Sequence, residues 1–294
     1  MINIDQYLDQ KRVEINRELG YYLPSAETSA VIEAMRYSLE AGGKRLRPIL
    51  TLAVAETMQG ESSDLLPLAC AYEMVHTYSL IHDDLPAMDD SDLRRGKATC
   101  HLEHGEAVAI LAGDALLTLA FEIVADYGLR HSCANKALLI IKNLSSASGA
   151  IGMIGGQALD LQGEKENLSL ADSEKMAALK TGTLIRSAVY CGAIASGADE
   201  TELEALDQYA RAIGLAFQVV DDLLDYESSP DQLGKPSGVD HVRSKSTFPA
   251  LMGLEQAKKR AERLCDKAIE ALQVIEKPTD TLEAIARKLV YRSS

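Results

Sequence analysis

Two clusters of aspartates have the residue type and spacing to bind a metal ion. The first is HDDLPAMDDSD at residues 82–92, and the second is QVVDDLLD at residues 218–225. In the second cluster Asp221 and Asp225 are four residues apart, which places both carboxylates on one face of a helix. In the first cluster a turn at Pro86 is expected to bring Asp89 back toward Asp83.

Both clusters are expected at the C-terminal ends of helices, where carboxylates are poorly placed. The helix dipole is negative at that end and disfavours each carboxylate by roughly 0.3–1 kcal/mol, before mutual repulsion is counted. A divalent cation would remove both penalties, and magnesium is typically held by one or two carboxylates together with waters and substrate phosphates. The alternative is that the clusters are ordinary solvated helix ends. Because there are two of them, each after an apolar run, the metal site is favoured.

Two other kinds of metal site fit the sequence less well. A calcium-binding EF-hand needs a D-x-[DN]-x-[DN]-G loop with glutamate at its twelfth position, and the sequence has no such loop. A di-iron carboxylate bundle needs Glu-x-x-His on two helices, and the segment from Glu73 to His76 supplies it once. On the residue pattern alone, His76 is as well explained by a place in the hydrophobic core as by ligand binding.

Basic residues gather in short segments that suit phosphate binding. They are GGKRLRP at 42–48, RRGK at 94–97, KTG at 180–182, GK at 234–235 and KST at 245–247. Arginine offers forked donors that match phosphate oxygens, and lysine offers a mobile point charge. Any one of these segments could be ordinary surface charge. Each aspartate cluster is followed by basic residues, however, and this order predicts a site for a metal ion together with a diphosphate.

The composition limits the partners of the chain. Its 294 residues carry a formal net charge of −14, so we expect no nucleic-acid binding, which needs clustered Lys and Arg. The five cysteines form no CxxC pair, which predicts no zinc site and fits a reducing compartment. No signal peptide is visible. The most apolar stretch, 107–125, contains Asp114 and Glu122, so we expect a buried helix, no membrane insertion and a cytoplasmic location.

Helical periodicity dominates the chain, and sustained alternating strand patterns are absent. Apolar residues from Val31 to Leu39 follow one helical face, and Gly42-Gly43 is expected to end that helix. Further helices are predicted at about 64–84, 105–127, 135–147, 171–195, 201–226 and 248–275. The helix at 201 is expected to begin with a capping box from Thr201 to Glu204. We therefore predict one all-α domain over residues 1–294.

Three segments are richer in Gly, Pro or charge and are expected to be irregular. They are residues 83–104, 149–168 and 228–247, and two of them directly follow an aspartate cluster. The helix at 171–195 is expected to break at Lys180-Thr181-Gly182. Functional residues are often carried by loops on a rigid scaffold, so these segments are the expected places for a site.

A series of motifs resembles a known family. GGKRLRP, YSLIHDDLPAMDDSDLRRG, ILAGDAL, KTG, FQVVDDLLD and LGK…KSTFPAL occur in the order seen in the trans-isoprenyl diphosphate synthases. Over about residues 40–255 the chain resembles the bacterial-type farnesyl diphosphate synthases of that family. The resemblance implies an all-α fold with a central cavity between helices, and aspartate clusters that face each other across its mouth. It also implies a homodimer and three Mg²⁺ ions per active site, with Mn²⁺ as a substitute.

The resemblance implies roles for the residues that match the family's motifs, position by position. Magnesium would be bound by Asp83, Asp89, Asp221 and Asp225, with Asp84 and Asp222 in support. The allylic diphosphate would be held by Arg94, Lys180, Thr181, Gln218 and Lys235. Isopentenyl diphosphate would be held by Lys44, Arg47, His76 and Arg95. The residues expected to act in catalysis are Asp83, Asp84, Asp89, Arg94, Lys180, Asp221, Asp222 and Lys235.

The implied reaction joins isopentenyl diphosphate to dimethylallyl or geranyl diphosphate and gives farnesyl diphosphate by ionisation, condensation and elimination. A backbone carbonyl freed near Lys180 and the side-chain oxygen of Gln218 are expected to face the allylic cation. Tyr78 and Ser79 stand about one turn below Asp83 and are expected to form a cavity floor that stops growth at fifteen carbons. The alternatives are a geranylgeranyl diphosphate synthase and a non-catalytic subunit of a heteromeric prenyl synthase, which would typically lack aspartates in one cluster.

Overall fold

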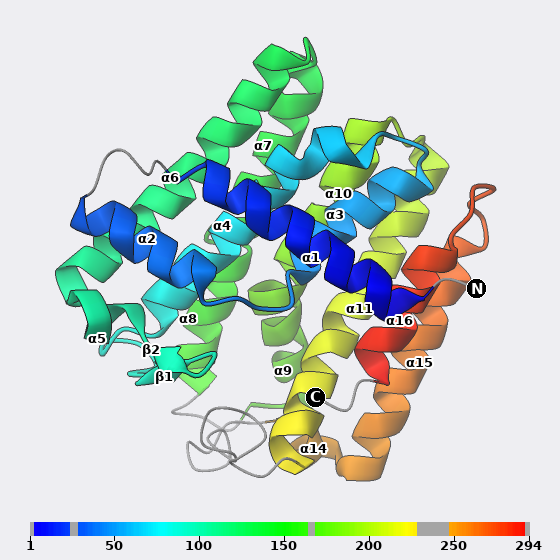
Figure 1. The fold of residues 1–294 in the computed structure, drawn as a ribbon. Coiled ribbons are helices and arrows are strands. Elements are labelled where there is room, and N and C mark those ends of the chain that lie inside the picture. The colour runs from blue at the N-terminus through cyan, green and yellow to red at the C-terminus, as the bar shows by residue number, and fades with distance from the viewer. Residues whose placement is uncertain (1–2, 24–28, 164–167, 228–246, 292–294) are drawn as a thin grey trace.

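The computed structural model describes residues 3–23, 29–163, 168–227 and 247–291 of the chain. In these residues the fold is almost entirely helical (Figure 1). Strands are limited there to one antiparallel hairpin made of β1, Leu93–Arg94, and β2, Lys97–Ala98. The prediction of an all-α fold is confirmed.

The helices follow one another with short connections along most of the chain. The first half contains α1 (Ile4–Tyr21), α2 (Ala30–Glu40), α3 (Leu46–Thr57), η1 (Ser62–Leu65), α4 (Leu66–Asp83), α5 (Cys100–His104), α6 (Glu106–Arg130) and α7 (Ala134–Ser148). The second half contains α8 (Met153–Gly163), α9 (Leu170–Ala177), η2 (Ala178–Gly182), α10 (Thr183–Ser196), α11 (Glu200–Glu227), α14 (Phe248–Met252), α15 (Leu254–Leu272) and α16 (Asp280–Val290).

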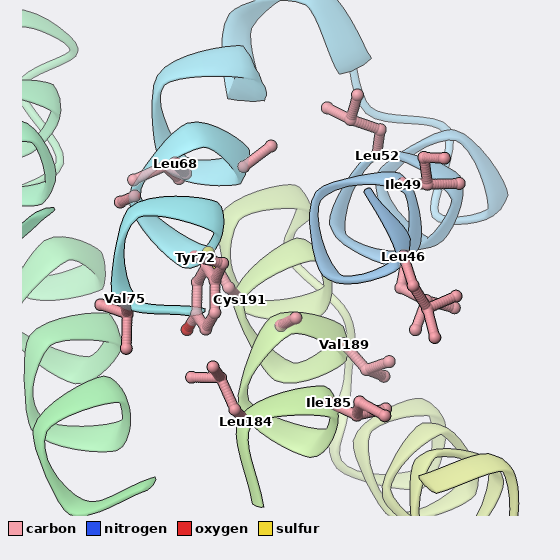
Figure 2. Close-up of a cluster of buried hydrophobic side chains, with 14 of the residues drawn as sticks. Leu46, Ile49, Leu52, Leu68, Tyr72, Val75, Leu184, Ile185, Val189 and Cys191 are labelled. Carbon is pink, nitrogen blue, oxygen red and sulfur yellow. The ribbon is translucent and has the colours of Figure 1, made fainter. Parts of the chain in front are cut away.

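The core of the fold is centred on α3, α4 and α10, whose apolar side chains meet in Figure 2. Nearly every residue of α4 from Leu66 to Val75 is buried, as expected of a helix with neighbours on several sides. Tyr72 is fully buried, and its hydroxyl makes a 2.9 Å hydrogen bond with that of Ser187 on α10. This packed helix ends at Asp83, so the first aspartate cluster directly follows a helix of the buried core.

The other long helices surround this centre. In Figure 1, α6 and α7 lie on one side of it, and α11, α15 and α16 lie on the other. Helix α11 packs along α15 and also contacts α10. The second aspartate cluster lies near the C-terminal end of α11, as predicted. The two clusters therefore approach the same region from different sides of the bundle.

Helix boundaries follow local signals, with one correction to the predicted capping box. Helix α2 ends before Gly42 and Gly43, which both have positive φ, as expected. The box at the start of α11 lies two residues earlier than predicted. The side chain of Asp199 accepts from the backbone N–H of Glu202 at 2.9 Å, and Glu202 accepts from that of Asp199 at 3.0 Å. Aspartate is a strong N-cap, so it takes this position ahead of Thr201.

The predicted loop at 149–168 is wrong in its centre, because residues 153–163 form α8. The glycines there serve close packing. A Cβ on Gly156 would overlap the backbone of Lys180 in η2, and α8 packs directly on η2. Glycine often indicates an irregular backbone, whereas here it lets two helical segments approach at van der Waals distance.

Two predicted helices are interrupted in ways that the periodicity does not show. The helix at 171–195 does not break at Lys180 but widens into the π-helical turn η2 between α9 and α10. Such turns are rare and often occur at functional sites. The helix at 248–275 is divided at Gly253, whose φ of 83° ends α14 and starts α15.

The prediction of a buried helix at 107–125 holds for one face of α6 only. In its most apolar window 39% of the residues are buried, and Ile110 and Leu111 on the outer face are 43% and 53% exposed. By length and composition, two helical stretches of the described chain are apolar enough to cross a membrane, Glu106–Arg130 and Ala134–Gly163. The inner face of α6 packs against α4, as in the core of a globular protein.

Candidate active site

A cavity of about 910 Å³ lies between α3, α4, α8, η2 and α11. The residues predicted for the site that line it are Lys44, Arg47, His76, Tyr78, Ser79, Asp83, Arg94, Arg95, Lys180, Thr181, Gln218 and Asp221. Four predicted residues, Asp84, Asp89, Asp222 and Asp225, do not line it. Lys235 lies outside the described residues. The cavity thus brings together one aspartate from each cluster and most of the predicted basic residues.

The first aspartate cluster turns back on itself as the sequence predicts. After α4 ends, the backbone N–H of Asp89 donates to the carbonyl of Asp83 at 2.8 Å, and that of Ser91 donates to the carbonyl of Asp84 at 3.2 Å. Burial raises the pKa of Asp83 to about 6; Lys180 opposes this shift and Asp89 adds to it. The turn after Pro86 therefore places two carboxylates near each other at the mouth of the cavity.

Asp84 faces away from the cavity and holds a basic residue in place. Its carboxylate accepts hydrogen bonds from Nε of Arg94 at 3.1 and 3.2 Å, and it also contacts the terminal guanidinium nitrogen. Asp84 is 3% exposed, whereas Arg94 comes from β1 and lines the cavity. A carboxylate paired with a guanidinium in two places fixes its orientation. Asp84 therefore positions Arg94 at the cavity wall.

Sequence reasoning missed Gln157 and Asp160, which α8 brings to the site. The side-chain amide of Gln157 donates to Asp83, and Lys180 makes a 2.6 Å ion pair with Asp160 and lies 3.5 Å from Asp83. Their spacing of three residues, which places both on one helical face, was the available signal. Because the sequence predicts an irregular segment here, this helical spacing does not point to a site.

The π-turn η2 places Lys180 and Thr181 at the cavity. The hydroxyl of Thr181 donates to the side-chain oxygen of Gln218 on α11 at 3.1 Å. Thr183 donates to the carbonyl of Leu179 at 2.6 Å, so a side chain satisfies one carbonyl of the widened turn. The turn therefore links α8, which packs on it, to the second aspartate cluster across the cavity.

The loop before α3 forms a basic pocket on another wall. Arg45 has a left-handed backbone with φ of 50°, and it makes a buried 2.7 Å ion pair with Glu73 on α4. This pair was also missed by sequence reasoning. It anchors the loop that carries Lys44 and leads into the first turn of α3, which carries Arg47. Gly43 has φ of 126°, which favours glycine, and a Cβ there would displace the guanidinium of Arg95.

Burial and neighbouring positive charges disfavour the protonated forms of the basic groups in this pocket. Burial lowers the pKa of Arg47 to about 10, although Glu73 opposes the shift. Burial and nearby guanidiniums, Arg47 and Arg95 foremost, lower the pKa of His76 well below its usual value. These buried groups lie close to several other positive charges. An anion with several oxygens is the ligand that would relieve them.

The donor set of the acidic side fits a metal ion that is bound together with substrate. Among the described residues, no three acidic, histidine or cysteine side chains form a ready-made metal cluster. Magnesium does not need one, because it takes one or two carboxylates and completes its shell with water and phosphate oxygens. Asp83 and Asp221 on the cavity wall, with Asp89 next to Asp83, are carboxylates of the kind that such an ion needs.

Comparisons with known proteins agree with this geometry. Residues 28–286 match the family model described as polyprenyl synthetase. The chain is 49% identical over 298 aligned positions to farnesyl diphosphate synthase of Escherichia coli (strain K12), covering 99% of this chain and 100% of that protein. It is 44% identical over 260 positions to farnesyl diphosphate synthase of Geobacillus stearothermophilus, covering 88% of each.

A solved structure has the same fold over nearly the whole chain. The apo structure of an FPP/GFPP synthase from Zymomonas mobilis superposes with a TM-score of 0.88 at 39% identity, covering 98% of this chain and 99% of that one. The family model covers well over half of the chain, and the relatives are similar along most of their length. The chain belongs to the polyprenyl synthetase family.

Proposed function

We propose that this protein is a farnesyl diphosphate synthase, a prenyltransferase that condenses isopentenyl diphosphate with dimethylallyl or geranyl diphosphate. The observation that carries the proposal is the cavity itself, which has acidic and basic walls around an apolar interior. The names of the relatives from Escherichia coli and Geobacillus stearothermophilus support it. Both aspartate clusters are complete, which speaks against a non-catalytic subunit.

The two diphosphates would bind at different walls. The allylic diphosphate would be held by Arg94, Lys180, Thr181 and Gln218, with Lys235 from outside the described residues. Isopentenyl diphosphate would be held in the basic pocket by Lys44, Arg47, His76 and Arg95. Each wall supplies cations or hydrogen-bond donors to a group that carries several negative charges. The distribution of basic residues over two walls fits an enzyme with two anionic substrates.

The acidic residues would hold magnesium with the allylic diphosphate. We assign Asp83, Asp89, Asp221 and Asp225 to this role, with three ions per site and Mn²⁺ as a substitute. When bound, the metal supplies Lewis-acid chemistry that neutralises the diphosphate as a leaving group. Lys180, which lies between Asp83 and Asp160, would assist the same charge.

The protein's own tasks are positioning and the exclusion of water. The apolar cavity walls keep water from the allylic cation, which water would quench. The carbon–oxygen bond of the allylic substrate breaks, and the double bond of isopentenyl diphosphate attacks the resulting cation. A proton is then lost to the departing diphosphate. The side-chain oxygen of Gln218 faces this region and would stabilise positive charge.

The floor of the cavity would set the length of the product. Tyr78 is 5% exposed, lines the cavity and makes an edge-to-face contact with His82 at 5.7 Å between ring centroids. Ser79 is its neighbour on α4. We assign these residues to stopping growth at fifteen carbons. The similar structure from Zymomonas mobilis is named an FPP/GFPP synthase, which supports a role for cavity side chains in setting the length.

The experiment that tests the function is a product assay. Purified protein would be incubated with geranyl diphosphate, labelled isopentenyl diphosphate and magnesium, with EDTA as the control. The expected product is a fifteen-carbon diphosphate that is lost with EDTA. A product of twenty carbons would favour geranylgeranyl diphosphate synthase. No product from folded protein would overturn the proposal and favour the partner-subunit hypothesis.

We further propose that the protein is a cytoplasmic homodimer. The outer faces of α6 and α7 expose Ile110, Leu111, Leu138 and Leu139 by 43–63%. Ile110 also lines the cavity, so a second copy on this face would close the cavity wall. The five cysteines are unpaired in the structure, in keeping with a reducing compartment. Light scattering should give the mass of a dimer, and Leu111→Glu should lower it; a monomeric wild type would contradict the proposal.

A further inference from the structure

Asp222 has a different environment from its neighbour Asp221. Asp221 lines the cavity, whereas Asp222 is 8% exposed and does not line it. Successive residues of a helix point about 100° apart, so two adjacent carboxylates cannot face the same ligand in the same way. Both oxygens of Asp222 accept hydrogen bonds from neutral groups of the protein. Oδ1 accepts from Nε2 of Gln218 at 2.9 Å, and Oδ2 accepts from the backbone N–H of Phe248 at 3.0 Å.

The bond from Gln218 to Asp222 determines which way the side-chain amide of Gln218 points. The oxygen and nitrogen of a glutamine side chain have nearly the same shape, so chemistry must decide between the two orientations. An ionised carboxylate only accepts hydrogen bonds, so the NH₂ group of Gln218 must face Asp222. The oxygen of Gln218 is then left on the cavity side, where the hydroxyl of Thr181 donates to it at 3.1 Å.

The carboxylate of Asp222 is itself held in place. The N–H of Phe248 belongs to the first turn of α14, and Phe248 is 2% exposed, so this donor needs a partner inside the protein. Asp222 satisfies it and cannot rotate without leaving it unpaired. The contact between α14 and α11 thus fixes Asp222, which in turn fixes Gln218.

We propose that Asp222 is a positioning residue that keeps the side-chain oxygen of Gln218, and not its NH₂ group, directed at the reacting carbons. This inference rests on the proposed prenyl transfer, in which positive charge develops in the cavity. A carbonyl oxygen has two lone pairs, of which Thr181 uses one. The other presents the negative end of the amide dipole to the cation, whereas a reversed amide would present its positive end.

The direct test is Asp222→Asn, which reverses this arrangement. Because the buried N–H of Phe248 still requires an acceptor, the oxygen of the new side chain would face Phe248 and its NH₂ group would face Gln218. The amide of Gln218 would then turn over and direct its own NH₂ group into the cavity. We expect kcat to fall on the order of 10–100-fold, with KM for both diphosphates within about threefold of wild type.

A second change should restore the function. In Asp222→Asn combined with Gln218→Glu, both oxygens of the new carboxylate accept. One pairs with the NH₂ group of the asparagine and the other faces Thr181. This double variant keeps the total charge of the wild type. We expect its kcat to be at least about tenfold higher than that of Asp222→Asn. In a Gln218→Leu background, Asp222→Asn should cost no further kcat, because the group it acts through is gone.

A matched control lies on the same helix. Gln208 donates to Glu204 at 2.9 Å, again from a glutamine to an acid four residues away, but this pair is exposed. Glu204→Gln should leave kcat unchanged. If Asp222→Asn does not fold, Gln218→Met, which keeps the backbone contact of Phe248, should still lower kcat.

Several results would overturn the inference. One is full kcat in Asp222→Asn or in Gln218→Met, and another is additive loss in the Gln218→Leu background. A loss in Asp222→Asn that Gln218→Glu does not restore would mean that Asp222 serves only to dock α14. Failure of the proposed function is distinguishable, because it would show in the wild type, which would then make no prenyl product; the inference would fall with it.

Discussion

The two walls of the cavity carry buried charges of opposite sign. On the acidic wall, Asp83 lies next to Asp89 and Lys180, and burial raises its pKa to about 6. On the basic wall, burial lowers the pKa of Arg47 to about 10 and that of His76 well below its usual value. In both places the charged form is disfavoured by the fold, and a ligand of opposite charge would relieve it.

The two walls are also stabilised differently. The basic loop is anchored by the buried pair between Arg45 and Glu73, which does not involve the side chains proposed to bind substrate. On the acidic wall, Lys180 and Gln157 contact Asp83 itself. The basic wall is therefore organised before its ligand arrives, whereas the acidic wall must exchange protein contacts for metal and diphosphate. Three predictions test this difference, and a fourth concerns the floor of the cavity between the walls.

The largest effect is expected for Asp83→Asn. Loss of this carboxylate should lower kcat on the order of 10³-fold, because metal-assisted charge neutralisation is worth several kcal/mol. The unliganded variant should be no less stable than the wild type, since burial disfavours the ionised form of Asp83. Steady-state kinetics and urea unfolding measure the two effects. A clear loss of stability would show that Asp83 stabilises the fold and that its ionised form is not disfavoured in the unliganded protein.

Arg47→Met should act on one substrate only. It removes a buried, charge-assisted donor from the basic pocket, which is worth about 1.5–3 kcal/mol, so KM for isopentenyl diphosphate should rise roughly 10–100-fold. KM for geranyl diphosphate should stay within about threefold, because that substrate is assigned to the other wall. Equal changes in both KM values would break the distinction between the walls.

His76→Asn should remove a pH dependence of stability. The folded-state pKa of His76 lies below the unfolded value of about 6.5, so below pH 6.5 the unfolded chain binds a proton that the folded one does not. The wild type should therefore lose up to about 1.4 kcal/mol per pH unit relative to His76→Asn as the pH falls from 6.5 toward the folded pKa. Urea unfolding of both unliganded proteins at pH 7.5 and 5.5 measures this. A constant difference between them would show that His76 is readily protonated.

The smallest effect on rate is expected for Tyr78→Ala, which changes neither wall. Removing the ring should open the cavity floor and lengthen the product to twenty carbons or more, while the first condensation keeps a rate within about tenfold of wild type. Product analysis by mass spectrometry decides the outcome. An unchanged fifteen-carbon product would remove Tyr78 as the determinant of length.

Much of the site follows from local patterns in the sequence. The turn that returns Asp89 to Asp83 was predicted from Pro86, and the structure confirms it. The position of the second cluster near the end of a helix was predicted from periodicity. What local patterns missed is α8, because glycine in a close helix contact looks like glycine in a loop. With α8 the sequence analysis also lost Gln157 and Asp160.

The sequence by itself determined the helical fold, the two aspartate clusters and the basic segments, since these depend on residues close together in the chain. Only the tertiary structure decided how neighbouring residues divide their tasks. Asp83 and Asp221 line the cavity, whereas Asp84 holds Arg94 and Asp222 holds Gln218 and Phe248. Adjacent helical residues point in different directions, and their partners come from elements distant in sequence, which no local pattern encodes.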